Sequence, residues 1–451
     1  MRAVNVTVIE TSGLGDRSYL VSGGGVAAVI DPQRDIDRVL DLARTLGVTI
    51  THVLETHLHN DYVTGGLELA CLVGAEYVVA AADQVAYERR AVADGDVIDA
   101  GPFRLQVMNT PGHTRHHVSY VLQTAEGAAV GVFTGGSMLH GTTGRTDLFG
   151  ADHTHELTHA QFHSVRRLAA ELPDAAKVYP THGFGSFCSA SPATGDCSTI
   201  ADERRSNPAL TSDEQHYVDG LIAGLSAYPA YYAHMGAMNA AGPDPVDLSM
   251  PQLIDSEELR RRINAGEWVV DLRNRTAFAA GHLAGTMGFE LSNSFVTYLG
   301  WLYSWGAPVT LIGDDTTQIL AARRELVRIG VDNVTGSAAG DIRELTDGAA
   351  LNSYRVASFA DLAEVLGSDD VTVLDVRQRG EYDDSHIFKA LNIPLPELIG
   401  RMDDVPTGEV WVHCRSGYRA AIAASLIEAP GRTVVLVDDG FDNAAKHDLT
   451  I

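Results

Sequence analysis

One short segment of the chain restricts its fold more than any other, because it requires a strand, a tight loop and a helix in direct succession. The apolar residues 409–413 predict a buried strand, and the alanine-rich residues 420–427 predict a helix. The loop between them begins at Cys414. Loop N–H groups and a helix N-terminus stabilise negative charge, so this position favours a thiolate over a thiol. We expect Cys414 to be a catalytic nucleophile assisted by Arg415 and Arg419; the alternative is a buried structural cysteine.

This segment resembles the active loop of rhodanese sulfurtransferases, in which the cysteine carries a persulfide. The resemblance extends upstream through Val373-Leu374-Asp375-Val376-Arg377, Glu381-Tyr382 and His386-Ile387. It implies that Ser416, Gly417 and Tyr418 complete a persulfide-holding loop. Related phosphatases use a loop that is one residue longer, so the short loop of this chain favours sulfane sulfur.

An internal repeat of about a hundred residues precedes this segment. Each copy has an apolar strand that ends in Asp-x-Arg, at residues 269–273 and 373–377, followed by a turn that contains a histidine. Such a period is too long for a solenoid. Gly313 of the first copy stands where the second has Cys414. We predict two rhodanese-like α/β domains with parallel sheets, inactive over 246–350 and active over 351–451; the alternative is two unrelated α/β units.

The N-terminal part, residues 1–245, includes a Pro-, Gly- and Ala-rich stretch at 228–245 that is interpreted as a linker. Within this part, histidines follow the ends of predicted strands: His57, His59, His113 and His182. Imidazoles gathered at one edge of a fold are suited to bind a metal ion. The remaining histidines here, His116 and His117 among them, are interpreted as surface or core residues.

The motifs His-x-His-x-Asp, Pro-Gly-His-Thr and Pro-Thr-His-Gly, in this order, resemble the metallo-β-lactamase fold, an αββα sandwich. Nearly the whole chain is similar to bacterial persulfide dioxygenases fused to an inactive and an active rhodanese domain. Tyr62 matches that family in placing an aromatic residue where metal-dependent hydrolases carry a further histidine. The resemblance implies a metal site of His57, His59 and His113. It also implies that four further residues either support the metal ligands by contact or supply an additional ligand: Asp61, His182, Arg145 and Asp147.

One position departs from the family pattern. The family holds Fe(II) with two histidines, matching His57 and His113, and an aspartate in Phe-Thr-Gly-Asp; here that run ends in Gly136. Three outcomes stay open: His59 completes a three-histidine site that suits zinc as well as iron, Asp61 or water completes the iron shell, or metal binds weakly or not at all.

The resemblance implies oxidation of a low-molecular-weight persulfide, of the glutathione persulfide type, to sulfite, coupled to sulfur transfer through Cys414. The alternatives are a zinc-dependent hydrolase of the thioesterase type and a metal-free sulfurtransferase. Fe(II) is the expected cofactor, and the alternatives are Zn(II) and no metal. We expect the protein to form a homodimer and to bind a persulfide or thiol as its small-molecule partner. No role is assigned to Cys188 or Cys197.

Net charge and composition argue against several classes of binding partner and cellular location. The net charge of −26 argues against nucleic acid and anionic membranes. Four cysteines are too few for a disulfide scaffold in a chain of 451 residues. The first residues lack the pattern of a signal peptide, and no apolar run reaches the roughly 18 residues of a membrane span. We expect a cytoplasmic enzyme.

Overall fold

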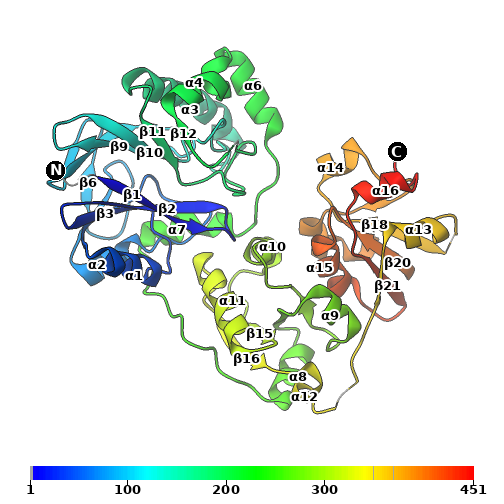
Figure 1. Ribbon diagram of the computed structural model, residues 1–451. Coiled ribbons are helices and arrows are strands. Elements are labelled where there is room, and N and C mark those ends of the chain that lie inside the picture. The colour runs from blue at the N-terminus through cyan, green and yellow to red at the C-terminus, as the bar shows by residue number, and fades with distance from the viewer. Residues whose placement is uncertain (1–3, 194, 349, 369) are drawn as a thin grey trace. The chain divides into compact units, whose positions relative to one another are not determined.

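The computed structural model describes residues 4–193, 195–348, 350–368 and 370–451, and their contacts divide into two compact units (Figure 1). The first unit comprises residues 1–247 with 326–330, and the second comprises 248–325 with 331–451. The three-domain division expected from the sequence stays a prediction. Among the described residues, no helix combines the length and the apolar character that crossing a membrane requires.

Two six-stranded sheets form the centre of the first unit. The first sheet has the order β1-β2-β3-β4-β5-β6, and the second has the order β12-β11-β10-β9-β8-β7. The strands of the first sheet are β1 Asn5–Thr11, β2 Asp16–Gly23, β3 Val26–Ile30, β4 Thr49–Leu54, β5 Glu76–Ala80 and β6 Arg90–Val92. Those of the second are β7 Val97–Asp99, β8 Phe103–Asn109, β9 Val118–Thr124, β10 Ala129–Gly135, β11 Lys177–Pro180 and β12 Ser198–Thr199.

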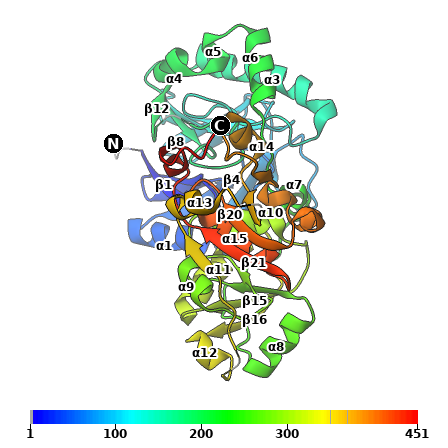
Figure 2. The same cartoon turned by 90° about the vertical axis from the view of Figure 1, so that its right-hand side faces the viewer.

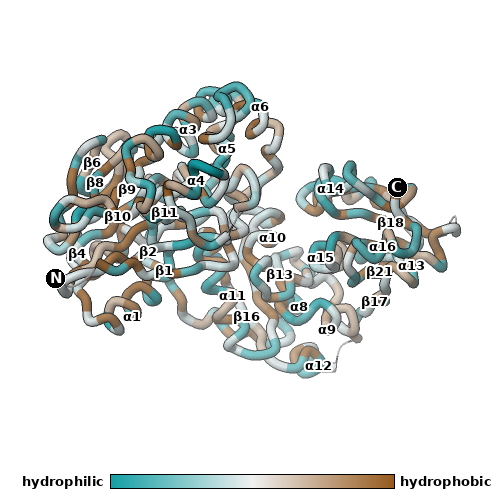
Figure 3. The backbone as a smooth tube through the Cα atoms, turned by 45° about the horizontal axis from the view of Figure 1, so that its top comes forward, coloured by the Kyte–Doolittle hydropathy of each residue, from teal (hydrophilic) through white to brown (hydrophobic). Residues whose placement is uncertain are grey.

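The two sheets pack face to face because each strand places apolar side chains on its inner face. One buried cluster joins Tyr19 and Leu54 of the first sheet to Phe103, Tyr120 and Phe133 of the second. Figure 3 shows brown, apolar residues interspersed with teal, polar ones along the first unit, as expected where each strand has one buried face.

Helices cover the outer faces of both sheets (Figures 1 and 2). Helices α1 (Asp37–Leu46) and α2 (Gly66–Val73) pack on the first sheet through one apolar cluster. Helix α3 (Ala151–Glu171) and α6 (Glu214–Gly224) cover the second sheet, with α4 (Ile200–Ser206) and α5 (Pro208–Thr211) beside them. The layers are therefore helix, sheet, sheet, helix, which confirms the predicted αββα sandwich.

The interpretation of residues 228–245 as a linker is wrong in part. Helix α7 (Tyr232–Ala241) occupies most of this stretch, and Tyr232, Met235 and Asn239 on it are buried. The glycine and alanine content of the stretch hid the buried face, because a helix held by tertiary contacts does not need a strong hydrophobic period of its own.

The second unit contains two sheets in which every strand pairing is parallel, as predicted. The first has the order β14-β13-β15-β16, with β13 Trp268–Asp271, β14 Met287–Gly288, β15 Val309–Gly313 and β16 Val334–Ala339. The second has the order β17-β21-β20-β18-β19, with β17 Arg355–Ala357, β18 Val371–Asp375, β19 Leu391–Asn392, β20 Gly408–His413 and β21 Arg432–Val437. Strand β15 is buried throughout, as expected of a parallel sheet covered on both faces.

Helices connect these parallel strands. Around the first sheet they are α8 Ser256–Asn264, α9 Arg275–Ala280, α10 Phe295–Leu302, α11 Thr316–Arg328 and α12 Ile342–Leu345. Around the second they are α13 Phe359–Val365, α14 Arg379–Asp384, α15 Tyr418–Ile427 and α16 Asp442–Lys446, with 3₁₀ turns at Leu395–Glu397 and Ile399–Asp404.

The strand register relates the two copies of the repeat. Asp271 of β13 lies opposite Ile312 of β15, and Asp375 of β18 lies opposite His413 of β20. The next residue along each of the partner strands is Gly313 in the first copy and Cys414 in the second. The register therefore places Gly313 where the second copy carries its thiol.

Candidate functional site

The first unit gathers the strand-end histidines into one buried cluster. His57 and His59 follow β4, His113 follows β8, and His182 follows β11. From the centre of the His57 ring, the other rings lie at 4.1 Å (His59), 4.9 Å (His113) and 5.3 Å (His182). None of the four side chains is more than 1% exposed. The structure thus brings the predicted ligands His57, His59 and His113 together and adds His182 to them.

The rings of His57, His113 and His182 share one hydrogen-bonding pattern. Their Nδ1 atoms have hydrogen-bond partners: Thr56 Oγ1 at 2.8 Å for His57, the carbonyl O of Arg145 at 2.8 Å for His113, and Asp16 Oδ1 at 2.9 Å for His182. The Nε2 atoms of His57 and His182 are 3.3 Å apart, and that of His113 is buried without a partner. An outer hydrogen bond to Nδ1 is the usual way in which proteins aim Nε2 at a metal.

The pKa values of these rings follow from burial and from neighbouring charges. Burial lowers the pKa of His113 to about 3, so this ring is a neutral donor at neutral pH. Burial also lowers the pKa of His57. For His182 the effect of burial is outweighed by the Asp61 and Asp16 carboxylates, which raise the pKa to about 10. A divalent cation would replace the proton that His182 Nε2 then carries.

His59 differs from the other three histidines. Its Nε2 lies 3.3 Å from Asp31 Oδ1, 3.3 Å from Glu55 Oε2 and 2.9 Å from the Tyr62 hydroxyl. Burial alone would lower the pKa of His59, but the two carboxylates outweigh it and raise the pKa to about 9. Only Nδ1 of this ring is without a partner. The Nε2 atom of His59 is therefore engaged by two carboxylates, whereas its Nδ1 has no hydrogen-bond partner.

The predicted outer residues lie around the cluster. Asp61 Oδ2 is 3.1 Å from His182 Nδ1, while its Oδ1 is buried without a partner. Burial raises the pKa of Asp16, next to Asp61, to about 7. Arg145 makes a bidentate ion pair with Asp147, with N···O distances of 2.7 and 2.8 Å, so this pair holds the loop whose carbonyl fixes His113.

Gly136 stands against the cluster and has no room for a side chain. A Cβ atom built there would lie 2.1 Å from Cδ2 of His113. The Gly136 N–H donates to His117 Nε2 at 3.0 Å, and the His117 ring stacks on His57 with centroids 4.8 Å apart. The interpretation of His117 as an ordinary core residue missed this supporting role; its proximity to His113 in sequence was the available signal.

Two further residues to which no role was assigned from the sequence lie at the site. Asn239 of α7 donates from Nδ2 to the carbonyl oxygens of His59 and Tyr62, at 2.8 and 2.9 Å, and so holds the His-x-His loop. Cys188 is buried near His113 and His182. No sequence signal marked Asn239, because it lies in the stretch interpreted as a linker.

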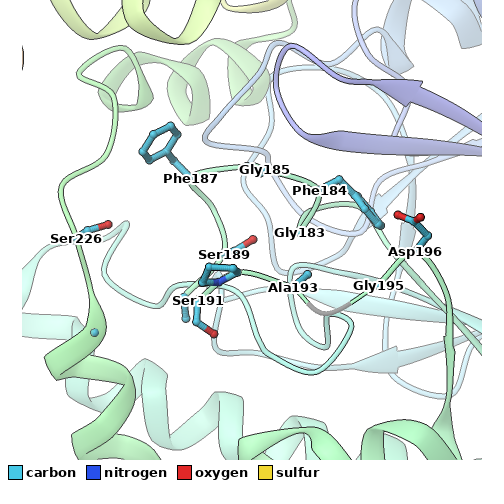
Figure 4. Close-up of a pocket in the computed structure, with 14 residues that line it drawn as sticks. Gly183, Phe184, Gly185, Phe187, Ser189, Ser191, Ala193, Gly195, Asp196 and Ser226 are labelled. Atoms are coloured by element: carbon cyan, nitrogen blue, oxygen red, sulfur yellow. The ribbon is translucent and has the colours of Figure 1, made fainter. Parts of the chain in front are cut away.

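A cavity of about 680 Å³ lies in the first unit (Figure 4). The loop that follows His182 supplies most of its lining, including Phe184, Phe187 and Ser189, and Ser226 lies across from them. Phe187 and Ser189 flank Cys188 in the chain, and Gly183 follows His182.

The second unit holds the predicted nucleophile at the turn between β20 and α15. Cys414 is only 1% exposed, whereas Arg415 and Ser416 are exposed. A sulfur donor therefore reaches the thiol only when the surrounding side chains move. Gly417, at the N-terminus of α15, has φ of +87°, and a Cβ there would lie against Asp438, so only glycine fits.

Charged groups surround this loop. Arg419 forms an ion pair with Glu381, with N···O distances of 2.6 and 2.8 Å, so its charge is shared with a carboxylate. The first N–H groups of α15 have no intrahelical partner and no side-chain cap, which leaves them free to bind an anion. The Tyr418 hydroxyl donates to the carbonyl O of Glu290 at 2.7 Å, so part of the loop is fixed by the preceding copy of the repeat.

The fold, the histidine cluster and the Cys414 loop define a class: a metallo-β-lactamase-fold protein with a histidine site suited to a metal, joined to a rhodanese-like domain. The family model of the rhodanese-like domain matches residues 358–447. Over 227 residues the chain is 29% identical to the human mitochondrial persulfide dioxygenase ETHE1, covering 50% of this chain and 77% of that protein. Over 164 residues it is 30% identical to the probable polyketide biosynthesis zinc-dependent hydrolase BaeB of Bacillus velezensis, covering 35% of this chain and 68% of that protein.

Among solved structures, the metallo-β-lactamase from Staphylococcus aureus has a TM-score of 0.68 and 28% identity, covering 75% of this chain and 100% of that chain. The chain belongs to the metallo-β-lactamase-fold proteins, as a homologue of persulfide dioxygenases that carries a C-terminal rhodanese domain.

Proposed function

We propose that this chain is an enzyme of sulfur metabolism with two reaction sites: oxidation of a low-molecular-weight persulfide to sulfite at the histidine cluster, and sulfane-sulfur transfer through Cys414. The observation that carries the proposal is the common hydrogen-bonding pattern of His57, His113 and His182, together with the similarity to persulfide dioxygenases. The presence of a rhodanese domain on the same chain supports the second activity.

The buried donor atoms fit a metal ion. His113 Nε2, His59 Nδ1 and Asp61 Oδ1 lack hydrogen-bond partners, and unpaired buried polar atoms are costly unless something else satisfies them. His182 would hold the ion together with His57 and His59 or together with His113 and Cys188, because the ligand atoms within each of these two groups lie within 4.8 Å of one another. Bound Fe(II) would supply the redox chemistry with dioxygen that side chains lack.

The residues around the cluster orient its donors and admit the substrate. Asp16, Thr56 and the Arg145 carbonyl fix the histidine tautomers, and the cavity beside Phe187 accommodates the carrier thiol. The overall reaction converts persulfide, dioxygen and water into thiol and sulfurous acid, with the outer sulfur oxidised by four electrons and dioxygen reduced by four.

In the second activity, the Cys414 thiolate attacks the outer sulfur of a donor such as thiosulfate. The sulfur–sulfur bond of the donor breaks, sulfite leaves with the electron pair, and Cys414 becomes a persulfide. The free N–H groups at the start of α15 stabilise its negative charge. Cyanide then removes the outer sulfur as thiocyanate and regenerates the thiolate. Because both sites belong to one chain, a persulfide handled at one site is present at a high effective concentration for the other.

A second candidate is a zinc-dependent hydrolase, favoured by the 30% identity to BaeB. Tyr62 argues against it, because this side chain stands where the hydrolases have another histidine and its hydroxyl contacts His59 Nε2. In this reading, the same histidines would hold Zn(II), which would supply the activation of water needed for thioester hydrolysis.

Metal analysis combined with oxygen uptake separates the candidates. Iron in the purified protein, together with oxygen consumption on addition of glutathione persulfide, is the expected result. Zinc with thioester turnover and no oxygen uptake would instead support the hydrolase. Thiosulfate–cyanide transfer by a protein that binds neither metal would leave only the sulfurtransferase.

A further inference from the structure

Gly136 stands at the position where a two-histidine, one-carboxylate iron site carries its carboxylate, so the chain lacks that particular ligand. Gly136 offers no carboxylate, and the His113 ring fills the space where one would begin. The nearby carboxylates of Asp16 and Asp61 contact His182 at Nδ1, whereas Nε2 of that ring lies 3.3 Å from His57 Nε2. A different anionic donor would be needed to take the place of the missing carboxylate.

Cys188 is such a group. Its Sγ and one ring nitrogen each of His113 and His182 all lie within 4.8 Å of one another, and all three residues are buried. The Cys188 side chain is fully buried, unlike those of Cys71 and Cys197, which are exposed. Three soft or borderline donors at this spacing match the composition of a metal site.

A second observation points to a ligand at the same place. His113 is fully buried, its Nδ1 is held by the carbonyl of Arg145, and its Nε2 has no hydrogen-bond partner. None of the described residues satisfies this nitrogen, although a buried unpaired nitrogen is destabilising. A metal ion between His113 and Cys188 would satisfy it.

The backbone holds the two donors together. The Arg145 N–H donates to the carbonyl O of Cys188 at 2.8 Å, and the Arg145 carbonyl accepts from His113 Nδ1. The Cys188 N–H donates to Ser186 Oγ at 3.2 Å. One residue, Arg145, therefore positions both Cys188 and His113, and its ion pair with Asp147 stabilises that arrangement.

We propose that Cys188 is the anionic ligand of the metal centre, acting with His113 and His182 in place of the carboxylate that Gly136 lacks. This inference rests on the proposed metal centre of the first unit. A thiolate carries the same single negative charge as a carboxylate, so it restores the charge of the site while adding a softer donor.

The protonation state of the thiol is consistent with this role only when a cation is bound. Burial, followed by the nearby Asp61 and Asp16 carboxylates, raises the pKa of Cys188 well above its ordinary value. Without a cation the side chain is a neutral thiol, and metal binding would ionise it and release one proton. Tyr232 of α7 hydrogen-bonds with the sulfur, so its hydroxyl can donate to the thiolate.

X-ray absorption spectroscopy of the full-length protein loaded with Zn(II) tests the proposal without relying on activity. We expect one sulfur neighbour at about 2.3 Å in addition to nitrogen and oxygen neighbours near 2.0–2.2 Å. Cys188→Ser should lose the sulfur neighbour and bind zinc on the order of 10- to 100-fold more weakly. The matched control Cys197→Ser, at an exposed cysteine, should keep both.

A further variant separates the ligand role from a structural one. Cys188→Asp should bind zinc more tightly than Cys188→Ser, but without the sulfur signal, because it restores the negative charge. Loaded wild-type protein with only nitrogen and oxygen neighbours would overturn the assignment of Cys188 and leave the dioxygenase proposal standing. Failure of the wild-type protein to bind zinc, iron or cobalt at all would overturn both proposals.

Discussion

The two copies of the repeat in the second unit share a scaffold and differ in the loop that carries chemistry. In both, an arginine two residues after the strand-end aspartate forms an ion pair with it, at 2.7 Å for Arg273–Asp271 and 2.6 Å for Arg377–Asp375. The turn that follows is also the same, since each arginine donates to a backbone carbonyl eight residues further on.

The difference lies where β15 and β20 end. The first copy continues as Gly313-Asp314-Asp315, and the second continues as Cys414-Arg415-Ser416. At the spacing of Arg419 the first copy has Gln318, whose Oε1 accepts from the Asp314 N–H and whose Nε2 donates to a backbone carbonyl. The partner of Arg419, Glu381, has Ala277 at the matching spacing. A fold can thus be kept while its reactive group is lost, and we propose that the first copy is inactive.

The largest expected effect is the loss of sulfur transfer when the Cys414 thiol is removed. Cys414→Ser is expected to reduce thiosulfate–cyanide transfer to the uncatalysed background, because no persulfide can form. Gly313→Ser is the matched change in the first copy, and it should leave transfer unchanged; a Cβ there meets mainly the flexible side chain of Gln318. Thiocyanate production measures both. Unchanged transfer in Cys414→Ser would refute the nucleophile.

The next effect concerns the shared ion pair. Arg377→Leu leaves the fully buried Asp375 without its charge partner, and such a change costs about 3–5 kcal/mol. Arg273→Leu should cost a similar amount in the first copy, where Asp271 is equally buried. Hydrogen exchange of peptides from each copy reports the loss separately. Destabilisation in only one copy would show that the scaffolds are not equivalent.

A smaller, pH-dependent effect should be confined to the second copy. Burial alone would raise the pKa of Glu381, but Arg419 outweighs burial and lowers it below the ordinary 4.5. The ion pair therefore stabilises the folded protein fully above about pH 4.5, and its contribution disappears as the pH falls through the lowered pKa.

Thermal unfolding of wild type and Glu381→Gln across pH measures this contribution. The difference in melting temperature should be present at pH 7 and should shrink below about pH 4.5. Ala277→Gln, the matched change in the first copy, should show no such pH dependence. A difference that stays constant into acid would mean that the Glu381 carboxylate is not the cause.

The smallest effect should come from the contact that joins the copies. Arg275 of the first copy lies 2.8 Å from Asp438 Oδ1 of the second and 2.7 Å from Glu290 Oε2. These partly exposed pairs are worth about 1 kcal/mol or less. Arg275→Ala should therefore lower the melting temperature slightly and leave thiocyanate production close to wild type. A large loss of transfer would instead show that the Arg275 ion pairs themselves position the Cys414 loop.

Local sequence patterns were sufficient to predict the strand, loop and helix around Cys414 and the placement of histidines at strand ends. Such features depend on residues close together in the chain, so alternation, apolar runs and glycine positions report them directly. The repeat, with Gly313 opposite Cys414, is also visible in the sequence, and the strand register agrees with it.

Only the tertiary structure decided how the side chains of the site are oriented. The orientation of the His113 and His182 rings depends on Arg145 and Asp16, which lie far from these histidines in the chain. Asn239 and Cys188 join the site through equally distant contacts. No local pattern encodes such contacts, because burial and hydrogen bonding between remote segments are settled only when the sheets and α7 pack together.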